Sequence, residues 1–299
     1  MNTLVVVNPA ASAGRAIKDY KNTIEELLHK YLGDFSVKYT SGVGDAARFA
    51  IKGERFDRVI CVGGDGTLNE IVNGLHNANL DIPIGLVSVG TGNDFKKTLG
   101  LVGSYEYMIQ RISNGKPKVF DLLEATYKGL DETIITRLAV NIIGAGFDAA
   151  VSQRINDARF KVRGKMSYVL SFLPEFMTTG TYPFDFSTND NLVQKSYYFV
   201  AFGNGKYFGG GMMVCPDAKP DDGYIDAVGI GGMPKLKLLY HFPKIYKGKH
   251  ISVKEVDHAK AKEFDVKSKK ETPIEMDGEV VGTLPLKIRI KEKALKILL

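Results

Sequence analysis

The sequence predicts two domains, a mostly parallel α/β domain at the N-terminus and an antiparallel, β-rich domain after it. A chain of 299 residues exceeds the roughly 100 to 200 residues of one ordinary domain. Strand and helix signals alternate at first, and beyond about residue 122 strand and turn signals prevail. We therefore place the domains at residues 1–122 and 123–299, with the extreme C-terminus free to return to the first domain.

The N-terminal elements are expected in βαβαβ order. Asn8-Pro9 stops the first strand, Gly33 ends the first helix, and Asp45 is placed to cap the second helix. This order predicts helices on both faces of the sheet. Apolar runs and period-2 alternation place the strands, and 3.6-residue spacing places the helices, at residues 4–7, 17–31, 35–39, 45–50, 59–62, 68–75 and 84–89.

The second domain reads as strands separated by turn clusters. Turns are expected at residues 188–191, at Asp222-Gly223 and at Asp277-Gly278. One helical interruption, residues 164–177, follows a basic start and carries apolar side chains that face either a lipid or the core. The strands are expected at residues 137–141, 197–202, 225–230 and 286–290.

Composition is that of an ordinary globular protein, with 44% hydrophobic and 25% charged residues. Cys61 and Cys215 are the only cysteines, which excludes a disulfide framework and fits a reducing cytoplasm. We expect no signal peptide, because the N-terminus lacks a basic segment before an apolar one. No run reaches the ~18 apolar residues of a membrane span, so any membrane contact is expected to be peripheral.

The net charge of +6 is modest, and its distribution is more informative than its size. Lysines alternate with apolar and aromatic residues in one stretch of the second domain, which suits contact with an anionic membrane. Elsewhere the basic residues are dispersed and no recognition motif occurs, so nucleic acid is not expected. The lysines of that stretch are Lys235, Lys237, Lys244, Lys247, Lys249 and Lys254.

The strongest local signal is the loop Gly63-Gly64-Asp65-Gly66-Thr67 between a buried strand and a helix. At the carboxyl edge of a parallel sheet, such a loop presents backbone amides and a helix N-terminus to polyphosphate. It lacks the Lys-Ser/Thr pair of a Walker A loop and the spacing of a dinucleotide loop. A capping box of Thr67 and Glu70 is also expected, but it does not explain three glycines around a carboxylate.

Two further loops join this one at neighbouring strand ends. Residues 90–95, which include Asn93 and Asp94, form a second glycine-polar loop, and residues 8–14 form a third. Together they predict one wide nucleotide cleft. Arg15 follows the third loop, where it either counters phosphate charge or starts a helix in solvent.

The order of these motifs resembles the bacterial diacylglycerol kinases and related lipid kinases, which share a nucleotide domain with sphingosine and ceramide kinases. The resemblance spans nearly the whole chain. Besides the three loops, it rests on residues 144–148, Gly164-Lys165, residues 203–205, 209–211 and 216–223, and Asp277-Gly278-Glu279.

The resemblance implies a Rossmann-like nucleotide domain and a β-sandwich domain, with ATP and a lipid substrate meeting between them. It implies a magnesium site made by the Asp222 side chain and the backbone carbonyls of Lys219 and Tyr224, and a proton-accepting role for Glu279. A position that is often Lys in relatives is Arg15 here. The ATP contacts implied are Asn8, Pro9, Ala10, Ala11, Ser12, Thr40, Gly63, Gly64, Asp65, Gly66, Thr67, Leu68, Asn69 and Thr91.

The carboxylates leave alternatives open. Asp65 either organises magnesium or braces its loop, and Asp94 and Asp121 are expected near it. Asp277 and Glu279 lie two residues apart and would share a face of an extended strand, so either can be the base that phosphoryl transfer needs. Asp-Gly is also the commonest hairpin signal, which makes a solvated turn the competing interpretation.

The function expected is thus an ATP- and magnesium-dependent kinase of diacylglycerol or a similar lipid alcohol, cytoplasmic and peripheral at the membrane, with a homodimer through the second domain plausible. Tyr207 and Phe208 lie among glycines and either line an acyl groove or belong to the core. The rival functions are an NAD kinase, which shares the Gly-Gly-Asp-Gly-Thr loop, and a nucleotide or lipid sensor without catalysis.

Overall fold

The computed structural model describes residues 1–89, 93–147, 179–188 and 191–299. The chain divides into two compact units, Met1–Asp121 with Glu292–Leu299, and Leu122–Lys291. The expected domain boundary, between residues 122 and 123, lies one residue from this division. Thr91, the pair Gly164-Lys165 and the expected helix at residues 164–177 lie outside the described residues.

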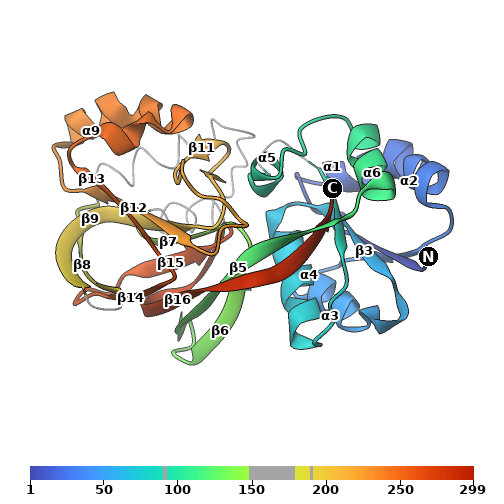
Figure 1. Cartoon of the computed structure of the whole chain (residues 1–299), viewed down its shortest axis with the longest axis horizontal. Coiled ribbons are helices and arrows are strands. Elements are labelled where there is room, and N and C mark those ends of the chain that lie inside the picture. The colour runs from blue at the N-terminus through green and yellow to red at the C-terminus, as the bar shows by residue number, and fades with distance from the viewer. Residues whose placement is uncertain (90–92, 148–178, 189–190) are drawn as a thin grey trace. The chain divides into compact units, whose positions relative to one another are not determined.

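The first unit is an α/β unit, as the alternation of strand and helix signals predicts. Its parallel strands stand in the order β16-β4-β3-β1-β2, in which only the C-terminal part of β16 takes part, through Ile297 beside Ile84. Helices α1, α2 and α6 cover one face, and α3 and α4 cover the other (Figure 1). The strands are β1 (Thr3–Val7), β2 (Ser36–Tyr39), β3 (Arg58–Gly63), β4 (Ile84–Ser88) and β16 (Glu279–Leu298).

The first predicted helix is continuous in chain but not in type. It runs as α1 (Arg15–Asp19), a π-helical turn (Tyr20–Ile24) and α2 (Glu25–Leu32), and Gly33 follows with φ 76°. A positive φ at this point is a conformation that glycine adopts at little cost. The remaining helices of this unit are a 3-10 turn (Gly53–Arg55), α5 (Phe95–Thr98) and α6 (Tyr105–Asn114).

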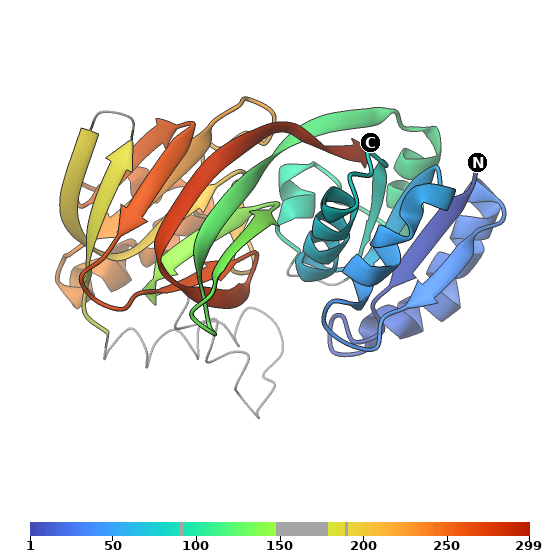
Figure 2. The same ribbon diagram turned by 90° about the horizontal axis from the view of Figure 1, so that it is seen from below.

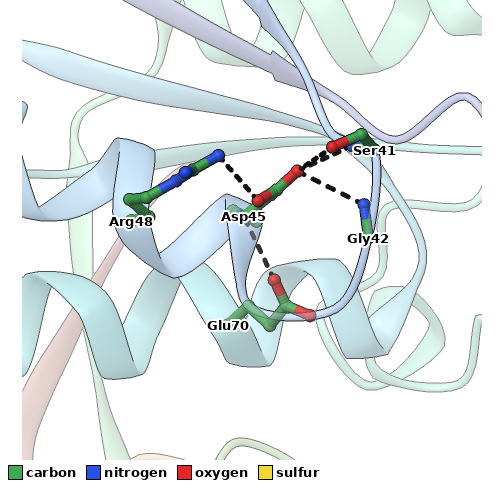
Figure 3. Close-up of polar contacts among 6 residues, drawn as sticks. Ser41, Gly42, Asp45, Arg48 and Glu70 are labelled. Atoms are coloured by element: carbon green, nitrogen blue, oxygen red, sulfur yellow. Dashed lines mark hydrogen bonds and ion pairs between the residues drawn. The ribbon is translucent and has the colours of Figure 1, made fainter.

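Both predicted N-caps of this unit are wrong, whereas Gly33 ends the first helix as predicted. Helix α3 (Asp45–Ile51) has Gly44 at its N-cap, and the Asp45 carboxylate instead accepts hydrogen bonds from the N–H groups of Ser41 and Gly42 (Figure 3). Helix α4 (Asp65–Asn77) has Gly64 at its N-cap without a side-chain bond, so the Thr67–Glu70 capping box does not form. Glu70 Oε2 accepts from Ala46 N at 3.0 Å and so caps α3 from the neighbouring helix.

The second unit is β-rich and antiparallel, as predicted. Six of its strands pair in a closed ring. The ring runs through β9, β8, β14, β16, β15 and β7, while β12 pairs with β9 outside it and carries β13. Figure 2 shows β5 and β16 side by side. The strands are β5 (Pro117–Gly129), β6 (Ile134–Ala139), β7 (Ile142–Gly146), β8 (Tyr182–Thr188), β9 (Asn191–Gly203), β10 (Tyr207–Phe208), β11 (Met212–Met213), β12 (Ile225–Gly231), β13 (Val256–Ala261), β14 (Glu263–Lys267) and β15 (Pro273–Met276).

Apolar side chains fill both sides of the sheet formed by β9 and β12. The side within the ring holds Phe184, Phe202 and Phe264, and the other side holds Ile245 from a layer made by α9 (Lys235–His241) and two 3-10 turns (Phe242–Lys247 and Lys249–Ser252). Phe208 packs in this second core, which is one of the two alternatives that the sequence leaves open for it. Among the described helices, none is long and apolar enough to span a bilayer.

Candidate functional site

Three loops of the first unit meet through side-chain hydrogen bonds at the carboxyl ends of their strands. Asn8 Nδ2 donates to Thr67 Oγ1 at 2.9 Å, which joins the loops after β1 and β3. Ser12 Oγ donates to the carbonyl of Val89 at 3.0 Å, which joins the loops after β1 and β4. Asn93 Nδ2 donates to Ser88 Oγ and to the Val89 carbonyl, and lies 3.4 Å from the carbonyl of Gly63. The polar residues singled out from the sequence therefore fix the loops to one another.

Asp65 is the first residue of α4, so the connection after β3 is shorter than the five-residue loop predicted. Its Oδ2 accepts from the backbone N–H of Asp94 at 2.8 Å. This bond shows the bracing role that the sequence left open, and it uses one carboxylate oxygen. Asp121, which was expected nearby, accepts from the backbone N–H of Lys293 at 2.7 Å and so braces the end of β16.

Two lysines at the start of α5 were missed from the sequence. Lys97 Nζ lies 2.6 Å from Asp94 Oδ1. Burial and the neighbouring Lys97 lower the pKa of Lys96, while Asp65 and Asp94 act in the opposite direction. The signal was their position directly after the glycine-polar loop, where basic side chains can meet phosphate.

The glycines of this connection differ in what they make room for. A Cβ at Gly63 would lie 2.7 Å from Thr67 Oγ1, so the residue is glycine for the protein's own packing. Among the described residues, and apart from the backbone of α4 itself, a Cβ at Gly66 would have no atom within 4 Å. Because Gly66 lies in the first turn of α4, where N–H groups lack intrahelical acceptors, that open space is available to an anionic ligand.

Not every predicted nucleotide contact is accessible. The side chain of Leu68 is fully buried and that of Asn69 is 1% exposed, and the Leu68 N–H donates to Gly64 O at 3.1 Å. Arg15 is 63% exposed and pairs with Asp19 at 3.0 Å. Thr40 follows β2, where its N–H donates to Val7 O at 2.9 Å.

The loop after β1 holds an unusual backbone. Ser12 and Ala13 have φ of 53° and 57°, and Gly14 has φ of 82°. Two successive non-glycine residues in the left-handed region are costly, at about 1 kcal/mol or more each, and such strain concentrates at ligand-binding loops. Here the Ser12 bond to Val89 helps to hold the conformation.

Asp277 and Glu279 do not share a face, because the chain turns between them. Asp277 (φ 50°) and Gly278 (φ 91°) form the two-residue turn between β15 and β16. The Asp277 carboxylate accepts from the backbone N–H groups of Val140, Asn141 and Ile142 at 2.8, 2.9 and 3.1 Å. Glu279 has a half-exposed side chain and pairs with Arg137 at 2.9 Å. The geometry therefore separates a structural carboxylate from an accessible one.

Asp222 lies in a second acidic region of the same unit. Lys260 Nζ donates to Asp222 Oδ2 at 2.7 Å, and the N–H of Tyr224 donates to Oδ1 at 3.1 Å. Asp226 Oδ2 is buried and has no hydrogen-bond partner among the described residues, and its ion pair with Lys260 is longer, at 3.6 Å. Burial raises the pKa of Asp226, Lys260 lowers it, and the carboxylates of Asp222 and Asp217 raise it further.

The carboxylate oxygens of Asp222 and Asp226 are suitable ligands for a hard cation. Carboxylate and carbonyl oxygens are the ligands that Mg²⁺ prefers, and a buried carboxylate oxygen without a donor gains from a nearby cation. No group of three or more His, Cys, Asp or Glu side chains in the described residues could hold a metal ion. A metal site here would therefore need backbone carbonyls, such as those that the resemblance implies at Lys219 and Tyr224.

The second unit also contains an apolar cavity of about 350 Å³. Tyr207 and Phe208 are not among its lining residues. The cavity is bounded by β8, β9, β12, β13 and β14, with the ion pair of Lys195 and Asp257 beside it. Its apolar walls include Phe186, Val193, Tyr197, Val200 and Phe264.

Comparison with known proteins matches both parts of the chain. Residues 2–125 match the diacylglycerol kinase catalytic domain, and residues 141–299 match the YegS C-terminal NAD kinase beta sandwich-like domain. A diacylglycerol kinase of Mycobacterium tuberculosis is 29% identical over 98% of this chain and 93% of its own length.

Solved structures share the fold. A diacylglycerol kinase from Bacillus anthracis superposes with a TM-score of 0.74 at 20% identity, covering 99% of this chain and 96% of its own. Yeast NADH kinase superposes with a TM-score of 0.52 at 14% identity, covering 99% of this chain and 82% of its own. An α/β domain followed by a β-sandwich-like domain is common to them, which confirms the fold class predicted from the sequence.

Proposed function

Because the chain belongs to the family of diacylglycerol kinases and related lipid kinases, we propose that it transfers the γ-phosphoryl group of ATP to the hydroxyl of diacylglycerol or a similar lipid alcohol. The proposal rests first on the loops after β1, β3 and β4. Hydrogen bonds between the described residues of these loops, the N-terminus of α4 and the lysines of α5 support an edge of the sheet that would bind the phosphates of ATP.

In the first unit, the backbone at Gly64 and Gly66 and the side chain of Lys96 would hold the phosphates of ATP. The bond between Asp65 and Asp94 keeps the loops after β3 and β4 in register. Preformed donors of this kind need no reorganisation when charge develops in the transition state. Leu68 and Asn69 would contribute through their places in the helix, because their side chains are buried.

We assign the general base to Glu279. Its carboxylate would take the proton from the lipid hydroxyl as that oxygen bonds to the γ-phosphorus and the bond to the β-phosphate oxygen of ADP breaks. Asp277 is the weaker candidate, because its oxygens accept three backbone N–H groups. Arg137 Nη2 lies 2.9 Å from Glu279 Oε2 and orients this carboxylate.

Magnesium, when bound, would supply positive charge that is needed beside a polyphosphate. The Asp222 side chain and the carbonyls of Lys219 and Tyr224 are the proposed ligands. Lys260 would have to release Asp222 Oδ2 on metal binding, and the Asp226 carboxylate would keep the region acidic.

The assignment of Glu279 is tested by Glu279→Gln in single-turnover experiments with ATP and dioctanoylglycerol. We expect phosphoryl transfer to slow by ~10²- to 10⁴-fold with unchanged nucleotide affinity, as for loss of a general base. Glu263→Gln, on β14, is the matched control and should keep the wild-type rate. An unchanged rate for Glu279→Gln would remove this residue from the mechanism.

The acceptor is identified by incubating the protein with labelled ATP and a total lipid extract, then determining which lipid carries the label. A labelled glyceride supports the proposal. Labelled NADP formed from added NAD, with no labelled lipid, would instead indicate an NAD kinase. Nucleotide binding without any labelled product would indicate a sensor.

A further inference from the structure

The layer of the second unit that contains α9 exposes two large apolar side chains. Leu236 is 82% exposed and Tyr240 is 76% exposed. They lie four residues apart and so share one side of the helix. Leu238 and Phe242, two residues further on in each case, pack against the core from the other side. The helix therefore has a side anchored in the core and a second side whose apolar side chains are exposed, with only the ring of the adjacent His241 beside Tyr240.

The same layer accounts for the whole net positive charge of the chain. Residues 234–254 contain six lysines and no Asp or Glu. The chain has 40 Lys and Arg against 34 Asp and Glu, so outside this layer the 34 remaining basic residues balance the 34 acidic ones. The net charge of +6 is thus a local property of one surface segment.

Part of this charge is available to an external partner. Lys237 pairs with Glu255 at 2.6 Å. Lys247 and Lys249 are exposed, and the described residues give them no ion pair. Figure 1 shows the layer on the side of β12 and β13 that faces away from β14 and β16. Cationic side chains around two exposed apolar ones form an amphipathic surface.

We propose that this layer, residues 234–254, is the surface by which the protein binds an anionic lipid bilayer, with Leu236 and Tyr240 inserted among the headgroups. The inference deepens the proposed function by naming the surface that reaches a membrane-held substrate. Charge selects the bilayer over a second copy of the chain, because a two-fold contact would bring the same lysines against each other. The two apolar side chains favour lipid over nucleic acid.

The test is sedimentation of the full chain, without nucleotide, with vesicles of phosphatidylcholine alone or mixed with phosphatidylglycerol. We expect binding to the mixed vesicles only, with weakening by salt. The double variant Leu236→Asn, Tyr240→Ser should bind at least tenfold more weakly at an unchanged melting temperature. Lys247→Gln and Lys249→Gln should each weaken binding about fivefold, which corresponds to one lysine near an anionic surface.

Matched controls lie in other parts of the same unit. Leu130 is 74% exposed, and Leu130→Asn should bind as the wild type does, as should Lys267→Gln. Equal binding by the wild type and the Leu236, Tyr240 variant would overturn the proposal, as would equal loss in the controls or dissociation of a dimer by that variant.

A kinase measurement separates this inference from the proposed function. The Leu236, Tyr240 variant should keep its rate on dioctanoylglycerol in solution and lose rate on long-chain diacylglycerol held in vesicles. Vesicle binding without any lipid phosphorylation would leave the surface standing and remove the proposed function.

Discussion

Two carboxylates of the first unit accept hydrogen bonds from backbone amides, whereas the two carboxylates assigned to chemistry in the second unit pair with cations. In the first unit Asp94 also pairs with a cation, Lys97. Asp65 and Glu70 accept from the N–H groups of Asp94 and Ala46. Asp222 and Glu279 pair with Lys260 and Arg137. A backbone N–H that donates to a carboxylate fixes the path of the chain, while a side-chain cation can be replaced by a metal ion or can leave the carboxylate free to take a proton. We therefore expect the carboxylates bound by backbone N–H groups to act in stability, and those paired with cations to act in the proposed reaction.

Asp277 is the exception in the second unit, and its removal should have the largest effect on stability. Asp277→Ala leaves the N–H groups of Val140, Asn141 and Ile142 without their acceptor, and all three residues are buried. We expect a loss of about 3 kcal/mol or more in the free energy of unfolding by urea. Asp277→Asn, which tolerates the positive φ and keeps one acceptor oxygen, should lose less. If Glu279→Gln were equally destabilising, the distinction between the two carboxylates would fail.

Gly63 and Gly66 distinguish a glycine needed for packing within the protein from one that leaves space for a ligand. Gly63→Ala places a Cβ against Thr67 and disturbs its bond to Asn8, so we expect a loss of about 1 to 3 kcal/mol in stability together with weaker nucleotide binding. The added methyl group of Gly66→Ala meets no atom of the described residues outside its own helix, so this variant should keep the melting temperature of the free protein. Calorimetric titration with ATP should show weaker binding by this variant too. Normal ATP affinity of Gly66→Ala would place the phosphates elsewhere.

Glu70 should have a smaller effect, because it supplies one helix cap. Glu70→Ala removes the acceptor for Ala46 N, and we expect a loss of about 1 kcal/mol measured by thermal unfolding. Glu70→Gln keeps an acceptor oxygen and should lose less than half of that. A loss as large for Glu54→Ala, on the exposed 3-10 turn, would show that general surface charge and not the cap is responsible.

The smallest expected effect is that of salt on carboxylate pKa values. It should distinguish Glu124, which is paired with cations, from Asp45, which accepts hydrogen bonds from Ser41. Burial tends to raise the pKa of Glu124, but Arg289 and Lys291 outweigh it and hold the pKa below its ordinary value. The pKa of Asp45 is held low by hydrogen bonds from Ser41. Both groups therefore stabilise the fold above their unfolded pKa values, and that stability is lost as the pH falls through their folded ones.

Added salt screens the cations beside Glu124 more than the neutral donors beside Asp45. Titration followed by carbon NMR should therefore show the pKa of Glu124 rising towards its ordinary value as NaCl is raised from about 0.1 to about 1 M, with a smaller change at Asp45. Equal movement of the two would mean that Arg48, and not Ser41, governs Asp45.

The fold and the loops could be predicted because their signals are local. Helical spacing, strand alternation and the glycines at strand ends each lie within a few residues. The N-terminal cap of α3 could not be predicted, because Glu70 lies 24 residues from Ala46, whose N–H it accepts. The pairs of Lys260 with Asp222 and of Arg137 with Glu279 likewise join distant segments, and no pattern in either segment names its partner. The Asp-Gly pair has a clear local turn signal, and the extended alternative is wrong because Asp277 and Gly278 both adopt positive φ.

The C-terminal part of β16 has a consequence for how the chain is made. Ile297 pairs with Ile84, so the strand beside β4 is synthesised only after the entire second unit. Until then β4 has an open edge, which is a template for pairing with other chains. Nascent or truncated chains that lack residues 292–299 should therefore be the ones that depend on chaperones. This holds although β1, β3, β4 and the loops that follow them are synthesised first.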